Sequence, residues 1–182
     1  KIKGAAYGDF SGRSVSSAGD VNGDGIDDII IGAPTADPSG TFEAGISYIV
    51  FGSQTRTAVE LDLSSLDGTN GFKINGAAER ERIGESVAPA GDINGDGIDD
   101  IIIGAPYAGA SYIVFGSQTR STTELDLSSL DGANGFKING IDAGDRSGTS
   151  VSSAGDINGD GIDDIIIGAP FASPGGNGRA GA

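Results

Sequence analysis

The sequence of 182 residues contains no cysteine, histidine, methionine or tryptophan. Without cysteine and histidine, disulfides, thiolate chemistry, the usual zinc sites and every histidine-dependent catalytic triad are excluded. Basic side chains are also scarce, because 11 Lys and Arg stand against 26 Asp and Glu and leave a formal net charge of -15. This excess of negative charge argues against nucleic acid or an anionic membrane as a partner and favours cations.

Long hydrophobic runs are missing as well. No segment approaches the roughly 18 apolar residues of a membrane-spanning helix, so no membrane insertion is expected. The residues after Lys1 do not resemble a signal peptide, which predicts that the chain starts after a processing site or inside a longer protein. Aromatic residues make up only 6% of the chain, so aliphatic side chains are expected to form the core.

Glycine is abundant, by contrast, and it recurs within a unit that is present three times. The stretch DVNGDGIDDIIIGAP at 20–34 is found again as DINGDGIDDIIIGAP at 92–106 and at 156–170. The copies begin 72 and 64 residues apart, and the difference lies in one connection, as expected of a surface loop. The chain therefore divides into three repeats, the last one incomplete: about 5–76, about 77–140 and about 141–182.

Each repeat has the pattern of four short β-strands separated by turns, with no helical periodicity. In the first copy the strands are expected at 14–19, 28–33, 47–52 and 72–74. The continuous isoleucine run of the second strand is typical of a strand that is buried on both faces. The linker ELDLSSL before the fourth strand is open to one helical turn. The sequence therefore predicts an all-β fold of four-stranded antiparallel meanders.

A four-stranded unit repeated at this length favours a β-propeller, in which the sheets pack radially as blades, over a β-solenoid with its shorter repeats. Residues 1–4 align with 73–76 in a fourth strand, and residues 181–182 align with 45–46 just before a third strand. About three blades are therefore expected in this chain. Because propellers usually have about 4 to 8 blades, we expect a portion of a larger propeller or of one that several chains complete.

The acidic stretch of each copy has the spacing of a calcium-binding loop. Counted from Asp20, side-chain oxygens lie at positions 1, 3, 5 and 9, glycine lies at position 6, and position 7 offers its backbone carbonyl. Calcium takes about six to eight oxygen ligands, and glycine permits the sharp reversal of the chain. The sequence predicts three calcium ions, one per copy, with these ligands: Asp20, Asn22, Asp24, Ile26 and Asp28; Asp92, Asn94, Asp96, Ile98 and Asp100; Asp156, Asn158, Asp160, Ile162 and Asp164.

The alternative for this stretch is a simple hairpin turn. A turn would explain the Asn-Gly and Asp-Gly pairs, but it would not explain the clustered carboxylates, which repel one another unless a cation neutralises them. The loop also differs from an EF-hand, since position 12 is Ile31 and a strand follows. The aspartates at position 8 are expected to point away, to solvent or to a neighbouring backbone: Asp27, Asp99 and Asp163.

With these loops and the strands that follow them, the sequence resembles the FG-GAP repeats of integrin α-subunit β-propellers and their bacterial relatives, over nearly the whole of residues 1–182. The Gly-Ala-Pro element lies at 32–34, 104–106 and 168–170. The glycine of the FG element corresponds to Gly12, Gly84 and Gly148. Its phenylalanine is replaced by Ser11, Ile83 and Ser147. The near-identity of the copies is more similar to a bacterial or cyanobacterial array than to an animal subunit.

The resemblance implies calcium loops between the first two strands of each blade, in secreted or cell-surface proteins that commonly mediate adhesion. It predicts a calcium-binding, non-catalytic, extracellular segment whose partner is a protein or a glycan. Aromatic residues on the variable connections are candidate contact residues, with partial burial as the alternative: Tyr7, Phe10, Phe42 and Tyr107.

Two other functions stay open at this point. The first is a structural subunit whose end blades pair with other copies of the chain into a ring or filament. The second is an accessory propeller of a larger secreted hydrolase. Catalysis within the chain is disfavoured because the acidic clusters recur with the repeat, whereas an active site needs one asymmetric constellation. A charged surface loop is the expected setting of the acidic residues found in one copy only: Glu79, Glu81 and Glu85.

Overall fold

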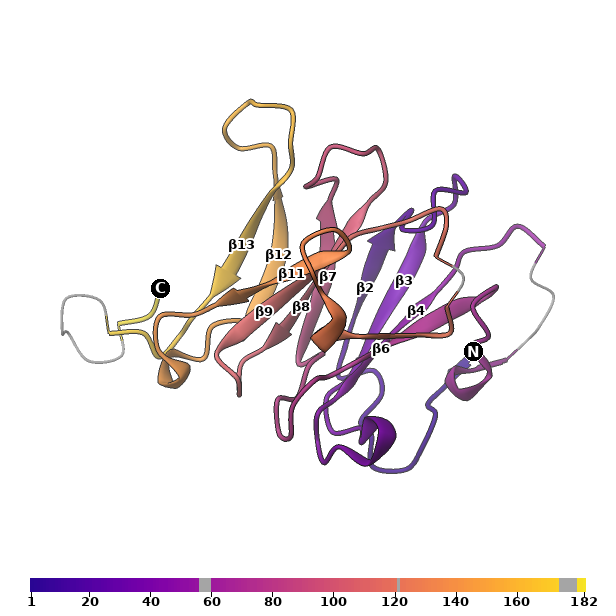
Figure 1. Cartoon of the computed structure of the whole chain (residues 1–182), viewed down its shortest axis with the longest axis horizontal. Helices are drawn as coiled ribbons and strands as arrows, with labels where there is room; N and C mark the ends of the chain where they lie inside the picture. Colours follow the sequence, from indigo (N-terminus) through magenta and orange to yellow (C-terminus); the bar gives the residue numbers. More distant parts are fainter. Residues whose placement is uncertain (56–59, 121, 174–179) are drawn as a thin grey trace.

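The computed structural model describes residues 1–55, 60–120, 122–173 and 180–182. Within these ranges the chain is all-β, with 13 strands, four short 3-10 helices and no α-helix. The strands form three blades that follow one another along the molecule from the N-terminal to the C-terminal end (Figure 1). The blade architecture predicted from the repeats is therefore confirmed.

Blade 1 is a four-stranded antiparallel meander. Its strands are β2 (Ser14–Gly19), β3 (Asp28–Ala33), β4 (Ile46–Val50) and β6 (Gly71–Asn75). The first two strands have the predicted bounds. The third lies one to two residues earlier than predicted, and the fourth extends further at both ends. A bulge near the end of β2 shifts the pairing beside the acidic loop.

Blades 2 and 3 repeat this arrangement. Blade 2 has the four antiparallel strands β7 (Ser86–Gly91), β8 (Asp100–Ala105), β9 (Ala110–Val114) and β11 (Gly135–Asn139). Blade 3 has, within the described residues, the inner pair β12 (Ser150–Gly155) and β13 (Asp164–Gly168). The three inner strands β2, β7 and β12 therefore lie in corresponding places.

The linker before each fourth strand connects one blade to the blade before it. In blade 2 the linker strand β10 (Glu124–Asp126) pairs in parallel with β6 of blade 1. In blade 1 the linker strand β5 (Leu61–Asp62) pairs in the same way with β1 (Ile2–Lys3), which aligns with β6. One 3-10 turn follows each linker strand, η2 (Leu63–Ser65) and η3 (Leu127–Ser129). A single helical turn in this linker is the alternative that the sequence leaves open. The remaining turns are η1 (Pro38–Gly40) and η4 (Ala143–Asp145).

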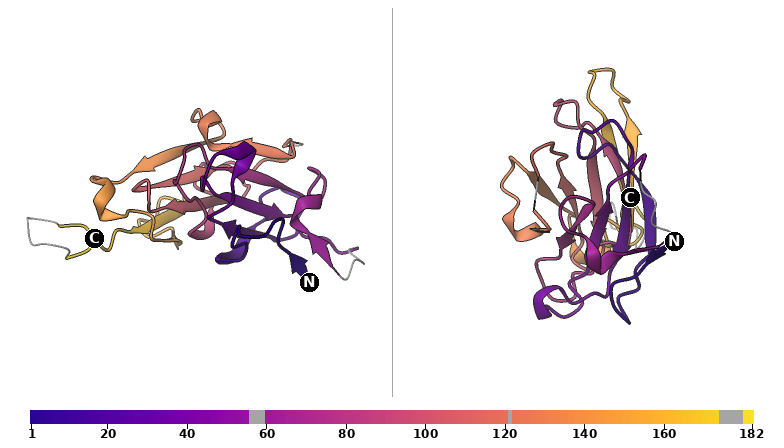
Figure 2. Two further views of the ribbon diagram at one scale, coloured as in Figure 1. Left: turned by 90° about the horizontal axis from the view of Figure 1, so that it is seen from below. Right: turned by 90° about the vertical axis from the view of Figure 1, so that its right-hand side faces the viewer.

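Two hydrophobic clusters lie between the blades, which pack against one another (Figures 1 and 2). A further cluster lies within blade 1 and its linker. The isoleucines of β8 face both ways: Ile101 and Ile103 pack toward blade 1, whereas Ile102 packs toward blade 3. All three are at most 2% exposed. The predicted burial on both faces is thereby confirmed for this strand. In the first copy it is confirmed for Ile30 and Ile31 but is wrong for Ile29, which is 37% exposed. Each blade is thus stabilised mainly by its neighbours.

Candidate functional site

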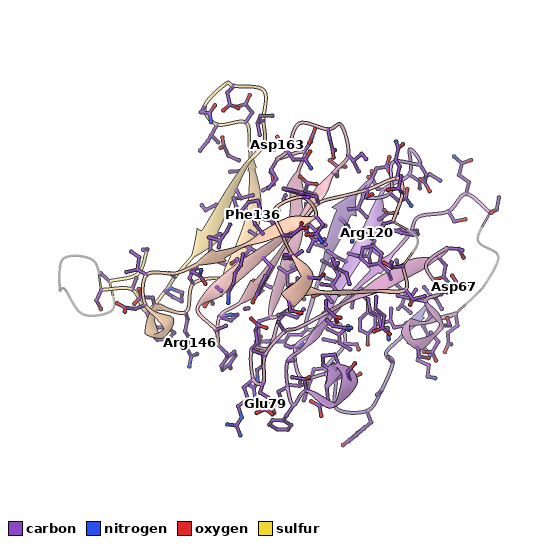
Figure 3. All side chains as sticks on the ribbon, in the orientation of Figure 1. Asp67, Glu79, Arg120, Phe136, Arg146 and Asp163 are labelled. Carbon is purple, nitrogen blue, oxygen red and sulfur yellow. The ribbon has the colours of Figure 1, made fainter. Side chains whose placement is uncertain are left out.

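The three acidic loops lie at the same rim of the blades. They join β2 to β3, β7 to β8 and β12 to β13 (Figure 1). This is the connection that the resemblance implied, between the first two strands of a blade. Figure 3 shows the side chains of the loops, with Asp163 labelled in the third.

The aspartate at position 1 holds the loop around its own carboxylate. In the first loop, Oδ1 of Asp20 accepts a hydrogen bond from the amide of Asp24 at 3.0 Å, and Oδ2 accepts one from the amide of Gly25 at 2.7 Å. The second and third loops repeat the bond to the position-6 glycine at 2.8 Å. Gly25 has a φ of 85°, which a glycine adopts without strain.

The side chains at positions 3 and 5 turn inward in the same way. Oδ1 of Asn22 accepts from the amide of Asp24 at 2.9 Å, and Oδ1 of Asp24 accepts from the amide of Ile26 at 2.9 Å. The corresponding bonds of the other two loops also measure 2.9 Å. The structure therefore brings the predicted ligands at positions 1, 3 and 5 onto the inner side of each loop.

In the first two loops the aspartate at position 9 is buried and anchors the loop to the sheet, whereas Asp164 of the third loop is half-buried. Asp28 is 1% exposed, and its two oxygens accept from the amides of Val21 at 3.2 Å and Gly52 at 2.7 Å. Asp100 is 0% exposed and makes the corresponding bonds. Burial raises the pKa of both carboxyls to about 6, against the effect of the amide bonds, and the aspartates at positions 5 and 1 raise it further. This anchoring role was not predicted, since the sequence pattern indicated a ligand only.

In the described part of the chain, no basic side chain forms an ion pair with a loop aspartate. The ion pairs of these residues join Lys or Arg to other acidic side chains. As arranged, no three Asp, Glu, His or Cys side chains of the described residues converge closely enough to hold a metal ion. The available donors are oxygens only, from carboxylates, an amide and a carbonyl, and this chemistry fits a hard cation.

The aspartate at position 8 connects neighbouring loops. Oδ2 of Asp99 accepts from the amide of Asp20 in the preceding loop at 2.8 Å, and Asp163 bonds Asp92 likewise at 3.2 Å. A Cβ at Gly19 would lie 2.2 Å from Asp99 Oδ2, so this close approach requires glycine. The prediction that these side chains point to a neighbouring backbone is confirmed for these two aspartates. Their counterpart in the first loop, Asp27, is exposed.

The two glycine elements of the repeat meet each other. Within each blade, the FG glycine donates its amide to the carbonyl of the GAP glycine at 2.9 to 3.1 Å. Between blades the same glycines are in contact, because a Cβ at Gly32 would lie 2.0 Å from the carbonyl oxygen of Gly84. A Cβ at Gly104 would lie 2.1 Å from the carbonyl oxygen of Gly148. These glycines thus permit the close packing of one blade on the next.

The candidate aromatic residues lie away from the acidic loops. Tyr7 is 106% exposed and Phe10 68%, whereas Phe42 and Tyr107 are each 46% exposed. The guanidinium groups of Arg82 and Arg146 lie over the ring of Tyr107 at 4.7 and 5.3 Å. Arg146 is at the rim opposite the loops (Figure 3). All four aromatic side chains are therefore accessible for contacts, although about half of the surface of Phe42 and of Tyr107 is covered.

The acidic residues unique to the second copy make separate contacts. The carboxylate of Glu81 is buried and accepts from the amides of Ala77 and Ala78 and from the Tyr112 hydroxyl. Glu85 pairs with Arg13 at 2.9 Å, and Glu79 is exposed. The expectation of a solvated loop is therefore wrong for Glu81, because its carboxylate is needed to satisfy buried donors.

No helix in the described residues is long and apolar enough to cross a membrane.

Comparison with known proteins agrees with the resemblance that the sequence shows. The model of the FG-GAP repeat family matches residues 11–50, 83–116 and 147–182. The chain is 35% identical over 90% of its length to integrin alpha pat-2 of Caenorhabditis elegans, and 30% identical over 95% of its length to integrin alpha-IIb of Mus musculus. It is also 33% identical over 91% of its length to the phosphatidylinositol-glycan-specific phospholipase D of Bos taurus. It spans only 13%, 16% and 19% of these three relatives, respectively.

Proposed function

Since the chain belongs to the FG-GAP repeat family, we propose that it is a calcium-binding, non-catalytic segment of an extracellular β-propeller that serves adhesion to a protein or glycan. The observation that carries this proposal is the acidic loop, whose inward-turned oxygens recur in every blade without a basic partner in the described residues. Relatives named as integrin alpha chains support the adhesive role. The exposed rim with Tyr7 and Phe10 is the proposed contact surface.

A cation would relieve the main electrostatic strain of each loop. Asp20, Asp24 and Asp28 are close enough for the first two to raise the pKa of the third. A divalent ion among them would offset this repulsion, and small rotations would turn their free lone pairs toward it. Because Asp28 begins β3 and accepts from the amide of Gly52, just after β4, the ion would hold both strands in register.

The expected gain in stability is large for a domain of this size. At a free calcium concentration of about ten times the dissociation constant, each site adds about 1.4 kcal/mol to the free energy of unfolding, and three sites add roughly 4 kcal/mol. A change of this size raises the melting temperature by roughly 10 °C.

The test is a calcium titration of the chain after treatment with EDTA, followed by its melting temperature and by calorimetry, with magnesium as the control ion. We expect a saturable rise that calcium produces and magnesium does not, with three ions bound per chain. Asp24→Ala, Asp96→Ala and Asp160→Ala should each remove one ion. Asp142→Ala, at an exposed position outside the loops, should remove none. A melting temperature that calcium leaves unchanged would refute the ion-binding part of the proposal.

A second candidate function is that of an accessory propeller in a larger hydrolase, which the likeness to a phospholipase D favours. Both candidates leave catalysis to residues outside this segment. We therefore expect the chain to show no turnover of a glycan panel or of a phosphatidylinositol glycan. Turnover by the chain would refute the non-catalytic proposal, and an enzyme domain in the flanking sequence would favour the accessory role.

A further inference from the structure

The connection that leads into the first strand of a blade has different contacts in blades 1 and 2. In blade 2 the buried carboxylate of Glu81 accepts hydrogen bonds from three donors of its own blade, the amides of Ala77 and Ala78 and the hydroxyl of Tyr112. The ammonium of Lys137 lies 4.0 Å from the same carboxylate. Glu81 therefore fills the space between this connection and β9.

Blade 1 has the same donors but no carboxylate that reaches them. Ala5, Ala6 and Tyr48 align with the three donors of blade 2, and their two amides and the hydroxyl have no hydrogen-bond partner among the described residues. Asp9 aligns with Glu81, and its side chain is one methylene shorter. Burial, and after it the charge of Asp9, raises the pKa of Tyr48 to about 12. Asp9 thus lies near the hydroxyl without accepting its hydrogen bond.

The place that Glu81 occupies in blade 2 is part of a cavity in blade 1. The cavity has a volume of about 660 Å3, which is within the range of about 300–1,000 Å3 for small-molecule sites. Its two walls are residues 5–10 and the longer connection of the first copy, residues 35–43. The hydroxyl of Thr35 joins these walls, because it donates to the carbonyl of Gly8 at 2.6 Å. Tyr48, which is 1% exposed, lines the cavity from the sheet.

The cavity lies on the side of residues 5–10 that faces their own blade, and all of its lining belongs to the first repeat. At the junction of blades 1 and 2, the amides of Arg80 and Arg82 donate to carbonyls of blade 1, whereas Glu81 between them turns to its own blade. Glu79, which aligns with Tyr7 of the cavity, is exposed although blade 1 lies beside it. Contacts between neighbouring blades therefore do not use the side on which the cavity opens.

The lining combines exposed aromatic rings with free hydrogen-bonding groups. Tyr7, Phe10 and Phe42 are 106%, 68% and 46% exposed. Tyr48 offers a hydroxyl proton, and the carboxylate of Asp9 accepts from no donor among the described residues. A sugar matches both features, because each of its hydroxyl groups donates and accepts, and the C–H groups of one ring face pack on an aromatic ring.

The charges of the cavity favour a neutral ligand. Its lysine, Lys73, is paired with Glu124 at 2.6 Å, whereas Asp9 and Asp37 form no ion pair in the described part of the chain. These carboxylates repel an anion. A quaternary ammonium would suit the aromatic rings, but it gives the hydroxyl of Tyr48 no acceptor.

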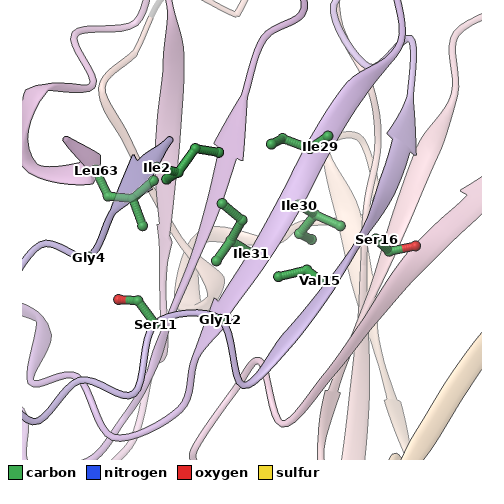
Figure 4. A pocket seen from close by; sticks show the side chains of 10 residues that line it. All are labelled: Ile2, Gly4, Ser11, Gly12, Val15, Ser16, Ile29, Ile30, Ile31 and Leu63. Atoms are coloured by element: carbon green, nitrogen blue, oxygen red, sulfur yellow. The ribbon is translucent and has the colours of Figure 1, made fainter. Parts of the chain in front are cut away.

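A second cavity of blade 1 lacks this combination. Its volume is about 470 Å3, and its lining is mainly aliphatic, with Val15, Ile29 and Leu63 among the residues (Figure 4). Neither a carboxylate nor an aromatic ring is among the described residues that line it. A sugar would leave most of its hydroxyl groups unpaired there.

We propose that the cavity between residues 5–10 and 35–43 binds a neutral sugar residue of a glycan. A sugar hydroxyl accepts from the hydroxyl of Tyr48 and donates to the carboxylate of Asp9, while the sugar ring packs on the exposed aromatic rings. This inference rests on the proposed adhesive function and deepens it, because it makes a glycan rather than a protein the partner. The cavity lies at the rim opposite the acidic loops, so the sugar does not need the proposed calcium ions.

The test measures binding of the methyl glycosides of glucose, galactose, mannose and N-acetylglucosamine to the whole chain, by ligand-observed NMR and calorimetry. We expect saturable binding of at least one glycoside. Tyr48→Phe and Asp9→Asn should each weaken it at least about tenfold, since a sugar hydroxyl loses its partner. Asp9→Glu should reach Tyr48 as Glu81 reaches Tyr112, and thereby abolish sugar binding and raise the melting temperature by about 2–4 °C.

The controls separate the cavity from other surfaces and from ion binding. Val15→Ser, in the second cavity, should bind the glycosides as the unchanged chain does. Each titration is run with calcium and with EDTA: sugar binding in EDTA supports the cavity even where calcium has no effect, and a calcium-dependent melting temperature without sugar binding overturns the cavity alone. Preference for methyl glucuronide or choline over the neutral glycosides also overturns it, as does unchanged sugar binding by Asp9→Glu.

Discussion

The glycine contact between blades leads to a sharp prediction for Gly104→Ala. The substitution adds one methyl group, which would lie 2.1 Å from the carbonyl oxygen of Gly148 in blade 3 and 2.2 Å from Oγ of Ser86. Gly104 lies inside β8 and does not have a positive φ, so alanine fits its backbone conformation. The effect is therefore steric and acts on the junction between blades 2 and 3.

The magnitude follows from two opposing terms. Overpacking a core usually destabilises by about 1–3 kcal/mol, and the upper end is expected because the obstacle is a backbone carbonyl rather than a flexible side chain. Replacing glycine by alanine also restricts the unfolded chain and stabilises by about 0.4–1 kcal/mol. The net expectation is a loss of about 2 kcal/mol in the free energy of unfolding.

The matched control is Gly168→Ala, the same residue of the repeat in blade 3. Its added methyl would lie 2.4 Å from Oγ of Ser150, a hydroxyl that rotates away, and its next nearest atoms in the described residues lie 3.8 Å away. We expect this variant to be as stable as the unchanged chain or slightly more stable. Urea unfolding at low micromolar concentration, with the dependence on denaturant compared among all three proteins, measures both effects. Equal stability of the two variants would refute the steric account of the junction.

Two further predictions use aligned positions in the same manner. Asp99→Ala leaves the amide of Asp20 without its acceptor and should lower the free energy of unfolding by about 1–2 kcal/mol. Asp27→Ala, at an exposed position, should change it by less than about 0.5 kcal/mol. Urea unfolding of both variants measures the difference, and equal losses would contradict the role of Asp99 as a bridge between loops. Tyr112→Phe removes a donor from the buried Glu81 carboxylate and should destabilise by about 1–3 kcal/mol. Tyr48→Phe, at the aligned place in blade 1, should be nearly neutral in thermal unfolding, and a loss as large as that of Tyr112→Phe would argue against the Glu81 contact.

Much of the fold could be predicted because the three copies of the repeat can be aligned with one another. Three copies of one pattern place the strands at the same positions in each unit, and the Gly-Ala-Pro and acidic elements mark the ends of the second strand. The inward turn of Asp20, Asn22 and Asp24 could also be predicted, since alternate residues of a tight loop share one side. These features depend on local spacing, which a sequence displays directly.

The contacts between blades could not be predicted in the same way. The parallel pairing of β10 with β6 joins Glu124 to Lys73 across about fifty residues, and no local pattern indicates the partner of so short a strand. The burial of Glu81, in the connection between β6 and β7, was missed for a related reason, because its donors include the hydroxyl of Tyr112 on β9. An acidic residue in a loop is usually solvated, and only the packed structure reveals the exception.

The acidic loop joins two properties of the molecule in one residue. The carboxylate of Asp20 faces the interior of its loop, where the ion is proposed to bind, while its backbone amide is held by Asp99 of the next blade. Any ordering of the Asp20 side chain by an ion therefore also orders the amide that the next blade must meet. Conversely, docking of the next blade fixes the backbone from which the first ligand extends. Each blade thus completes the loop before it, which explains why aspartates that contribute no ligand are repeated as faithfully as those proposed to bind the ion.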